Sequence, residues 1–149
     1  MKSSKILNKC MYLLCFLFCQ ITWSQTVFGK WKTIDDRNGV EKAIIEIYKE
    51  DGMLHAKVVK ILEDGKKGAL CTKCDGDKKD KPILGMTIMK DFEEHKDGIY
   101  KGDTLFDPEQ AMTFRGKVWL DEDNEDRLKV RGYLAFLHRT QTWHRVVEN

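Results

Sequence analysis

Short runs of alternating apolar and polar residues recur along this chain, and each is followed by a cluster of turn-forming residues. Between residues 42 and 49, Ala43, Ile45 and Ile47 fall on one face, and the tight-turn sequence Glu50-Asp51-Gly52 follows. Period-two alternation bounded by such turns is the pattern of half-buried β-strands. We expect eight strands, at about residues 26–34, 42–49, 53–62, 83–91, 99–106, 112–120, 127–136 and 140–147. Residues 93–96 read instead as a short helical turn.

The number of strands and their short connections favour one fold class. An all-β, eight-stranded antiparallel up-and-down barrel, lipocalin-like, has no exposed sheet edges because the sheet closes on itself. With eight strands the interior is either filled by side chains or holds one small ligand. No linker or internal repeat divides residues 25–149, so we expect a single β-barrel domain there, with one long loop at residues 63–81.

The N-terminus has the three parts of a secretory signal peptide. Lys2, Lys5 and Lys9 precede an apolar run over residues 10–19, and Ser24 supplies a small residue at a cleavage position. The apolar run is too short for a stable membrane span, which needs about 20 residues. We therefore expect residues 1–24 to be a cleaved signal peptide and the protein to be exported, periplasmic or secreted.

Removal of this segment changes the chemistry that the chain can carry. The 149-residue chain has a formal charge of +2, but residues 25–149 hold 23 basic and 24 acidic residues, a charge of −1. Without a basic surplus, we expect no nucleic-acid partner. All three serines, Ser3, Ser4 and Ser24, also lie in the segment, so serine-nucleophile mechanisms are excluded from the mature chain.

Cys71 and Cys74 are the cysteines that remain after residue 24. In an exported protein two such cysteines favour a disulfide, which would pin the long loop. A redox or thiol-reactive role is an alternative, although neither a βαβ setting nor a helix N-terminus is visible for the first thiolate. A zinc site is another, but one Cys-x-x-Cys supplies two of four ligands. The histidines are scattered and offer no second close pair, so we expect no metal; they are His55, His95, His138 and His144.

Acid–base and cofactor chemistry have little support in the sequence. Asp107 and Glu109 flank Pro108, where a turn role is the simpler interpretation because Asp readily caps local backbone N–H groups. There is no Gly-x-Gly-x-x-Gly and no Walker-type loop, so we expect no nucleotide cofactor. We assign no catalytic residue and expect no cofactor.

The first and last expected strands carry a closure signal. Phe28-Gly29-Lys30-Trp31 opens the first strand, and Arg145 lies on the last, which must sit beside the first if the barrel closes. An Arg guanidinium over a Trp ring is a favourable pair, worth about 0.5–2 kcal/mol. The arrangement resembles the closure of lipocalins and related calycin barrels, with the indole plugging one end.

A resemblance to a known family covers nearly the whole of residues 25–149. The motifs occur in order: Gly29-Lys30-Trp31-Lys32-Thr33, Cys71-Thr72-Lys73-Cys74, Asp80-Lys81-Pro82-Ile83-Leu84-Gly85-Met86, Leu105-Phe106-Asp107-Pro108-Glu109, Leu128-Lys129-Val130-Arg131-Gly132-Tyr133 and Arg139-Thr140-Gln141-Thr142-Trp143. Together they resemble the bacterial exported family catalogued as domain of unknown function 2147. The resemblance implies a lipocalin-like barrel and no agreed activity. The chain departs from the family at Gln110-Ala111, where members tend to have glycine.

Cationic and aromatic residues gather on the last strands. By parity Lys129, Arg131 and Tyr133 share one face. Gln141, Trp143 and Arg145 share another, as do Arg115, Lys117 and Trp119. Either these side chains coat the outside, with their stems over apolar surface, or part of the set lines the barrel mouth. For the second case the candidate ligand-binding residues are Trp31, Arg131, Tyr133, Trp143 and Arg145.

Three functional hypotheses follow. The first is an exported, non-catalytic barrel that binds a small apolar or amphipathic molecule of the cell envelope. The second is a protein-interaction module that docks an unknown envelope partner through its outer surface or the Cys71–Cys74 loop. The third is a thiol-dependent enzyme. Fold alone does not rank them, because such barrels host unrelated functions.

Overall fold

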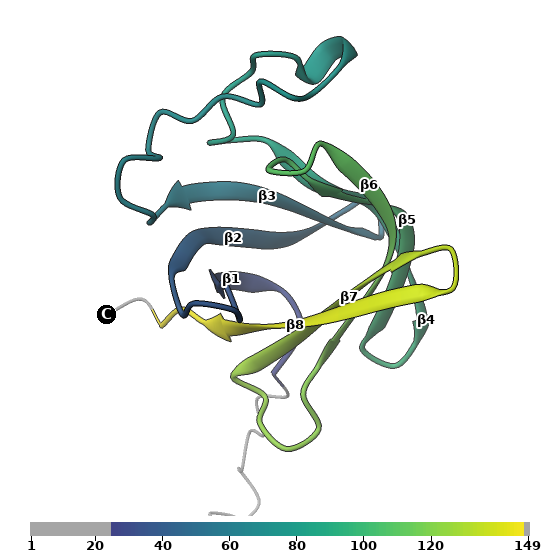
Figure 1. Cartoon of the computed structure of the whole chain (residues 1–149). Coiled ribbons are helices and arrows are strands. Elements are labelled where there is room, and N and C mark those ends of the chain that lie inside the picture. The colour runs from purple at the N-terminus through teal and green to yellow at the C-terminus, as the bar shows by residue number, and fades with distance from the viewer. Residues whose placement is uncertain (1–24, 148–149) are drawn as a thin grey trace, which may run out of the picture.

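The computed structural model describes residues 25–147 and shows a closed barrel in which each strand pairs antiparallel with the next (Figure 1). The strands are β1 (Gly29–Ile34), β2 (Glu41–Glu50), β3 (Met53–Ile61), β4 (Thr87–Lys96), β5 (Ile99–Asp107), β6 (Met112–Leu120), β7 (Arg127–Leu134) and β8 (Leu137–Arg145). β8 returns to pair with β1. The predicted all-β, lipocalin-like up-and-down barrel is therefore confirmed. The expected signal peptide, residues 1–24, lies outside the described residues.

The sequence located seven strands to within a few residues and misplaced one. β4 was expected at residues 83–91, with a helical turn at 93–96, but the strand covers Thr87–Lys96. Glu93 and Glu94 pair with Lys101 and Tyr100 of β5, so this polar stretch is exposed strand and the helical prediction is wrong. In the described chain the helical piece is η1 (Gly76–Lys78), a single 3₁₀ turn. No described helix is long and apolar enough to cross a membrane.

The barrel has a packed end and an end that carries the longer connections. Alternate connections of an up-and-down barrel lie at the same end, so the β1–β2, β3–β4, β5–β6 and β7–β8 connections surround one opening, which we call the mouth. Most of the largest fully buried side chains lie towards the other end, among them Trp31, Leu54 and Leu128. The core is thus concentrated away from the mouth.

The β3–β4 connection is long but ordered. It runs beside the end of β3 as the teal segment at the top of Figure 1. Leu70 bridges to Pro82, and the Cys71 N–H donates to the carbonyl of Lys81 at 2.8 Å. The Cys71–Cys74 disulfide and Met86 form a small buried cluster against Phe106, which attaches the loop to β5. The predicted disulfide is confirmed, and it pins this loop.

A row of three glycines crosses the barrel wall at mid-height. Gly102, Gly116 and Gly132 are successive register partners on β5, β6 and β7. The ring of Phe92, which is fully buried, lies over the first two: a β-carbon added at Gly102 would be 2.4 Å from Phe92 Cδ2, and one at Gly116 2.6 Å from Cζ. At Gly132 the nearest atom would be 3.5 Å away, an ordinary contact. Gly102 and Gly116 therefore make room for the Phe92 ring, whereas the atoms nearest to Gly132 belong to Leu105 and Phe114.

This difference within one row gives a matched pair of substitutions. We expect Gly116→Ala to destabilise the fold by about 1–3 kcal/mol, because the new methyl group forces the buried Phe92 ring to move. Gly132→Ala, in the same row but with room for a methyl group, should change the free energy of unfolding little. Urea unfolding monitored by circular dichroism measures both. Equal losses in the two variants would show that Phe92 does not constrain the row.

Candidate functional site

The mouth leads into a cavity of about 880 Å³ inside the barrel. Its floor consists of buried apolar side chains from five strands, namely Ile45, Val58, Ile88, Val130 and Trp143. Its walls are also largely apolar and include Ile61, Leu105 and Phe114. Pockets of about 300–1,000 Å³ with apolar walls and a few polar groups are typical of small-molecule sites. This cavity is the candidate functional site.

Polar side chains of the mouth are arranged as ion pairs. Arg37 binds Asp35 with two donors, Nε at 3.0 Å and Nη2 at 2.8 Å. Lys42 reaches Glu63 at 2.8 Å and Glu109 at 3.2 Å. Arg139 of β8 pairs with Asp36 of the β1–β2 connection. These pairs involve the β1–β2, β3–β4 and β5–β6 connections and strands β2 and β8, and they leave the opening close to neutral.

The Asp35–Arg37 pair has a distinct electrostatic character. The carboxyl of Asp35 is almost fully covered, and Arg37 donates to it from both its guanidinium and its backbone N–H. These hydrogen bonds, the side-chain ones first, hold the pKa of Asp35 well below its usual range. Hydrogen bonds to Glu63, and then to Glu109, raise the pKa of Lys42. Both groups are therefore charged at neutral pH.

One polar side chain lies on the inner wall beside the floor. Gln141 lines the cavity, and its Oε1 accepts a hydrogen bond from Trp143 Nε1 at 3.2 Å. Because the oxygen is used in this way, the amide NH₂ is the group available to donate to a ligand.

Three of the five predicted site residues lie inside the barrel, at two different levels. Trp143 forms part of the cavity floor. Trp31 and Arg145 lie at the closed end, where the Arg145 guanidinium carbon is 4.2 Å from the Trp31 ring centroid. Gly29, in the left-handed region at φ 124°, lets the chain pass close to this guanidinium. The predicted cation–π closure is confirmed; it plugs the end opposite the mouth.

The structure does not bring Arg131 and Tyr133 together with these residues. They pair with Thr140 and His138 on the outward-facing register of β7 and β8, and neither lines the cavity. Arg131 donates to Thr140 Oγ1 at 2.7 Å and lies over the Trp119 ring. The sequence left open whether the cationic and aromatic residues of the last strands coat the outside or face the interior. Those of β6 and β7 lie outside, whereas Gln141, Trp143 and Arg145 of β8 face inward.

Several cavity residues were missed by sequence reasoning. Gln141 shared the correct parity with Trp143, and that signal could have identified it. Leu105 and Phe114 looked like ordinary strand residues. The Lys42 ion pairs had no local signal, because Glu63 and Glu109 are 21 and 67 residues away.

Asp107 acts as the turn residue that the sequence suggested. Its Oδ1 accepts the backbone N–H of Glu109 at 2.9 Å and of Gln110 at 3.2 Å. Ala111, in the Gln110-Ala111 segment that follows this turn, lies in the left-handed region at φ 54°. Ala111 thus adopts a backbone conformation that disfavours side chains.

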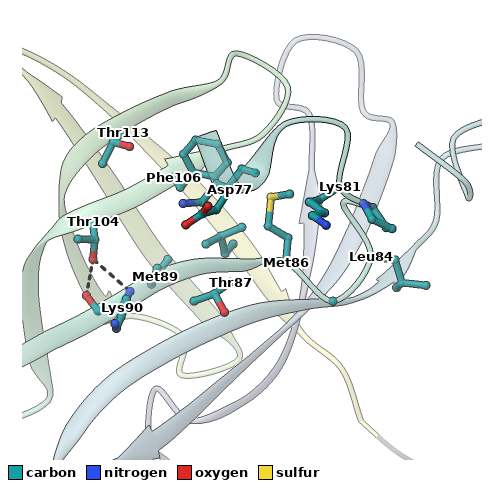
Figure 2. A pocket seen from close by; sticks show the side chains of 14 residues that line it. Asp77, Lys81, Leu84, Met86, Thr87, Met89, Lys90, Thr104, Phe106 and Thr113 are labelled. Atoms are coloured by element: carbon teal, nitrogen blue, oxygen red, sulfur yellow. Dashed lines mark hydrogen bonds between the residues drawn. The ribbon is translucent and has the colours of Figure 1, made fainter. Parts of the chain in front are cut away.

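A second hollow, a groove of about 510 Å³, lies on the side of the barrel between β4 and β5 (Figure 2). The regular ladder between these strands extends towards the mouth as far as Glu93 and Lys101. Beyond it, Thr104 Oγ1 accepts the Lys90 N–H at 3.1 Å and donates to the Lys90 carbonyl, as the dashed lines in Figure 2 show. Ile88 and Phe106 line both hollows, so these two side chains separate the groove from the cavity.

The remaining chemistry is limited. Cys71 and Cys74 are buried as well as bonded to each other, whereas a reactive thiolate needs exposure. Within residues 25–147, no three His, Cys, Asp or Glu side chains gather where they could hold a metal ion.

Comparisons with known proteins agree with this geometry. The model of the family "Uncharacterized protein conserved in bacteria (DUF2147)" matches residues 29–145. Among curated proteins, none matches this chain. A solved structure, Protein HP1028 from the human pathogen Helicobacter pylori, described as belonging to the lipocalin family, is similar with a TM-score of 0.70. That similarity covers 84% of this chain and 86% of the other at 15% sequence identity, so it concerns the fold alone.

The low pKa of Asp35 predicts a pH-dependent stability. A carboxyl whose pKa is depressed on folding contributes stability above its unfolded pKa of about 3.9, and this contribution is lost as the pH falls towards the folded value. We expect Asp35→Asn to lower the urea midpoint at pH 7. Its difference from the wild type should stay constant down to about pH 5 and shrink below about pH 4. Asp64→Asn, at an exposed loop position, is the control; a difference that persists unchanged in acid would contradict the assignment.

Proposed function

This chain belongs to the DUF2147 family, and from that premise and the geometry of the mouth we propose that it binds a small apolar or amphipathic molecule in the barrel cavity. The observation that carries the proposal is the cavity of about 880 Å³, with an apolar floor and a polar opening. A barrel of eight strands that served only as a folded scaffold could fill its interior with side chains. Here the packed end is filled and the mouth end is not.

The ligand inferred from the lining has two parts. Trp143, Val130 and the other floor residues offer apolar contact, which favours a hydrocarbon or ring system. Gln141 offers an amide donor within the wall. Arg37, Lys42 and Arg139 are already paired with carboxylates. The other two lining cations, Lys66 and Lys73, are exposed, so solvent and salt screen their charge. A neutral polar group therefore suits this mouth better than a strongly anionic one.

The proposal includes export and a non-catalytic role. Export is supported by the basic, apolar and small-residue segments within residues 1–24. The cell envelope is then the source of the ligand. The absence of serine after residue 24 and the burial of both remaining cysteines support binding rather than nucleophilic catalysis.

A pair of adjacent substitutions tests the cavity. Ala43 lines it, whereas Ile44, the next residue of β2, pairs with Lys32 and Lys60 on the opposite face. With Nile red, a neutral solvatochromic dye, as the probe, we expect Ala43→Phe to weaken binding about tenfold or more, because the ring occupies ligand volume. Ile44→Phe should bind like the wild type. Thermal unfolding of both variants establishes that they are folded.

The outcomes separate the hypotheses. Equal dye affinity in the three proteins would move the binding site to the outer surface and contradict the cavity proposal. Native mass spectrometry of protein purified gently from its own host complements the titration, since a co-purifying small molecule identifies the ligand class directly. A bare mass together with a partner recovered by crosslinking in cells would support the protein-docking alternative.

A further inference from the structure

Exposed apolar side chains are concentrated at the mouth. Eight large apolar side chains are exposed among residues 25–147, and seven of them lie at this end. Four of the seven are on its connections, and three are strand residues directly beside a connection; Val147 is the exception. Leu84 belongs to the side groove. We call the other six the apolar rim: Val40, Leu70, Met112, Leu134, Phe136 and Leu137. All four connections around the mouth contribute to it or adjoin it.

The β7–β8 hairpin is the most exposed part of the apolar rim. Leu134 pairs with Leu137, and the two-residue turn between them is Ala135-Phe136. Phe136 is 90% exposed and Leu137 61%. In Figure 1 the hairpin projects to the right, on the opposite side of the barrel from the β3–β4 connection. Its tip is therefore free of contact with the longest loop.

The composition of this turn is unfavourable for folding in water. Ala135 lies in the left-handed region at φ 52°, where a side chain costs roughly 1–2 kcal/mol. Two-residue hairpin turns favour glycine and asparagine, which adopt this conformation at a lower cost. Neither residue would expose a large apolar side chain as Phe136 does. An exposed Leu-Ala-Phe-Leu tip thus stabilises neither the turn nor the core. Such exposed apolar surface is typical of an interaction site.

The apolar rim is continuous with the cavity. Leu70, Leu134 and Leu137 are exposed to solvent and also line the cavity wall. An apolar molecule could pass from whatever covers the rim to the floor at Trp143 along these side chains. We therefore expect the apolar rim to be covered by an environment that can itself dissolve an apolar ligand.

The charges and the layout of the rim distinguish a lipid bilayer from a protein partner. Asp35–Arg37, Asp36–Arg139 and the Lys42 pairs leave the mouth nearly neutral, so no strongly charged partner is favoured. A stable protein interface needs a contiguous, shape-matched surface of about 800 Å² per partner. The apolar rim is instead divided among four connections, and only the β7–β8 hairpin supplies more than one of its residues. A fluid bilayer accepts each tip independently, since apolar groups insert about 5–10 Å into its headgroup region.

We propose that the apolar rim docks on the surface of a lipid bilayer, with Phe136 inserted among the lipids and the mouth turned towards them. The docking contact is apolar and does not require anionic lipid. That the bilayer delivers or receives the ligand rests on the proposed function, whereas the docking itself does not. The hairpin is the anchor, and the cavity opens where it meets the membrane.

Vesicle binding by matched variants tests the docking. Phe136→Ser removes the anchor, and Val147→Ser removes an exposed apolar side chain outside the mouth as the control. With vesicles of phosphatidylcholine alone, we expect the wild type and the control to sediment together with the vesicles. The vesicle affinity of Phe136→Ser should be at least about tenfold lower. Because the contact is apolar, high salt should not release the protein. Phe136→Trp should show a blue-shifted emission and quenching by brominated lipid, in excess of the native tryptophans.

The alternatives give different results. Binding that needs phosphatidylglycerol and is lost in high salt would overturn the proposal in favour of the lysine-containing β3–β4 connection. A dimer in sedimentation velocity that Phe136→Ser abolishes, without vesicle binding by the wild type, would assign the rim to a second copy. Nile red affinity in solution separates the two proposals, because Phe136→Ser should retain it. Loss of vesicle binding with dye binding retained tests the docking alone. Failure of the wild type to bind the dye would instead contradict the proposed function.

Discussion

The barrel closes at a short seam between β1 and β8, where the guanidinium of Arg145 lies over the ring of Trp31. β1 and β8 share two register pairs within the described chain, followed by a bond from the Val146 N–H to the Lys30 carbonyl, whereas β7 and β8 share eight pairs. Arg145 compensates for this short ladder by donating to the carbonyls of Thr26 and Glu125. Trp31 donates to the Val27 carbonyl and fills the centre of the same end. One cation and one ring thus join the first strand, the last strand and the segment before the barrel.

A sealed end lets the rest of the barrel be asymmetric. Most of the fully buried large side chains lie in the same half of the barrel as Trp31, and Phe92 covers Gly102 and Gly116 at mid-height. The packing that stabilises the fold is therefore complete below the level at which the cavity begins. The mouth end can then carry an unfilled volume and paired charges without supplying most of the core. The attached β3–β4 connection adds wall there, because its disulfide cluster packs against Phe106.

The sequence was informative where local pattern determines structure, and less so where distant residues do. Alternation and turn residues predicted the eight strands, and Gly29, Trp31 and Arg145 predicted the closure. Parity divided β7 and β8 into two sets but did not say which set faces inward, because both carry large side chains. Arg131 and Tyr133 were therefore grouped with Trp143, although they face outward. β4 was displaced because Ile83, which looks like strand, instead packs on the disulfide cluster.

The charge pairs at the mouth connect the cavity with the surface around it. An unpaired Asp35 in its covered position would be costly, so we expect the proposed ligand to leave Arg37 as its partner. The same holds for Lys42, which contacts carboxylates on two different connections. Lys66 and Lys73 are exposed, where solvent and salt screen their charge. In the proposed function, selection at this mouth therefore rests on apolar contact and the amide of Gln141. The same near-neutrality suits the proposed docking of the apolar rim, which needs no electrostatic attraction.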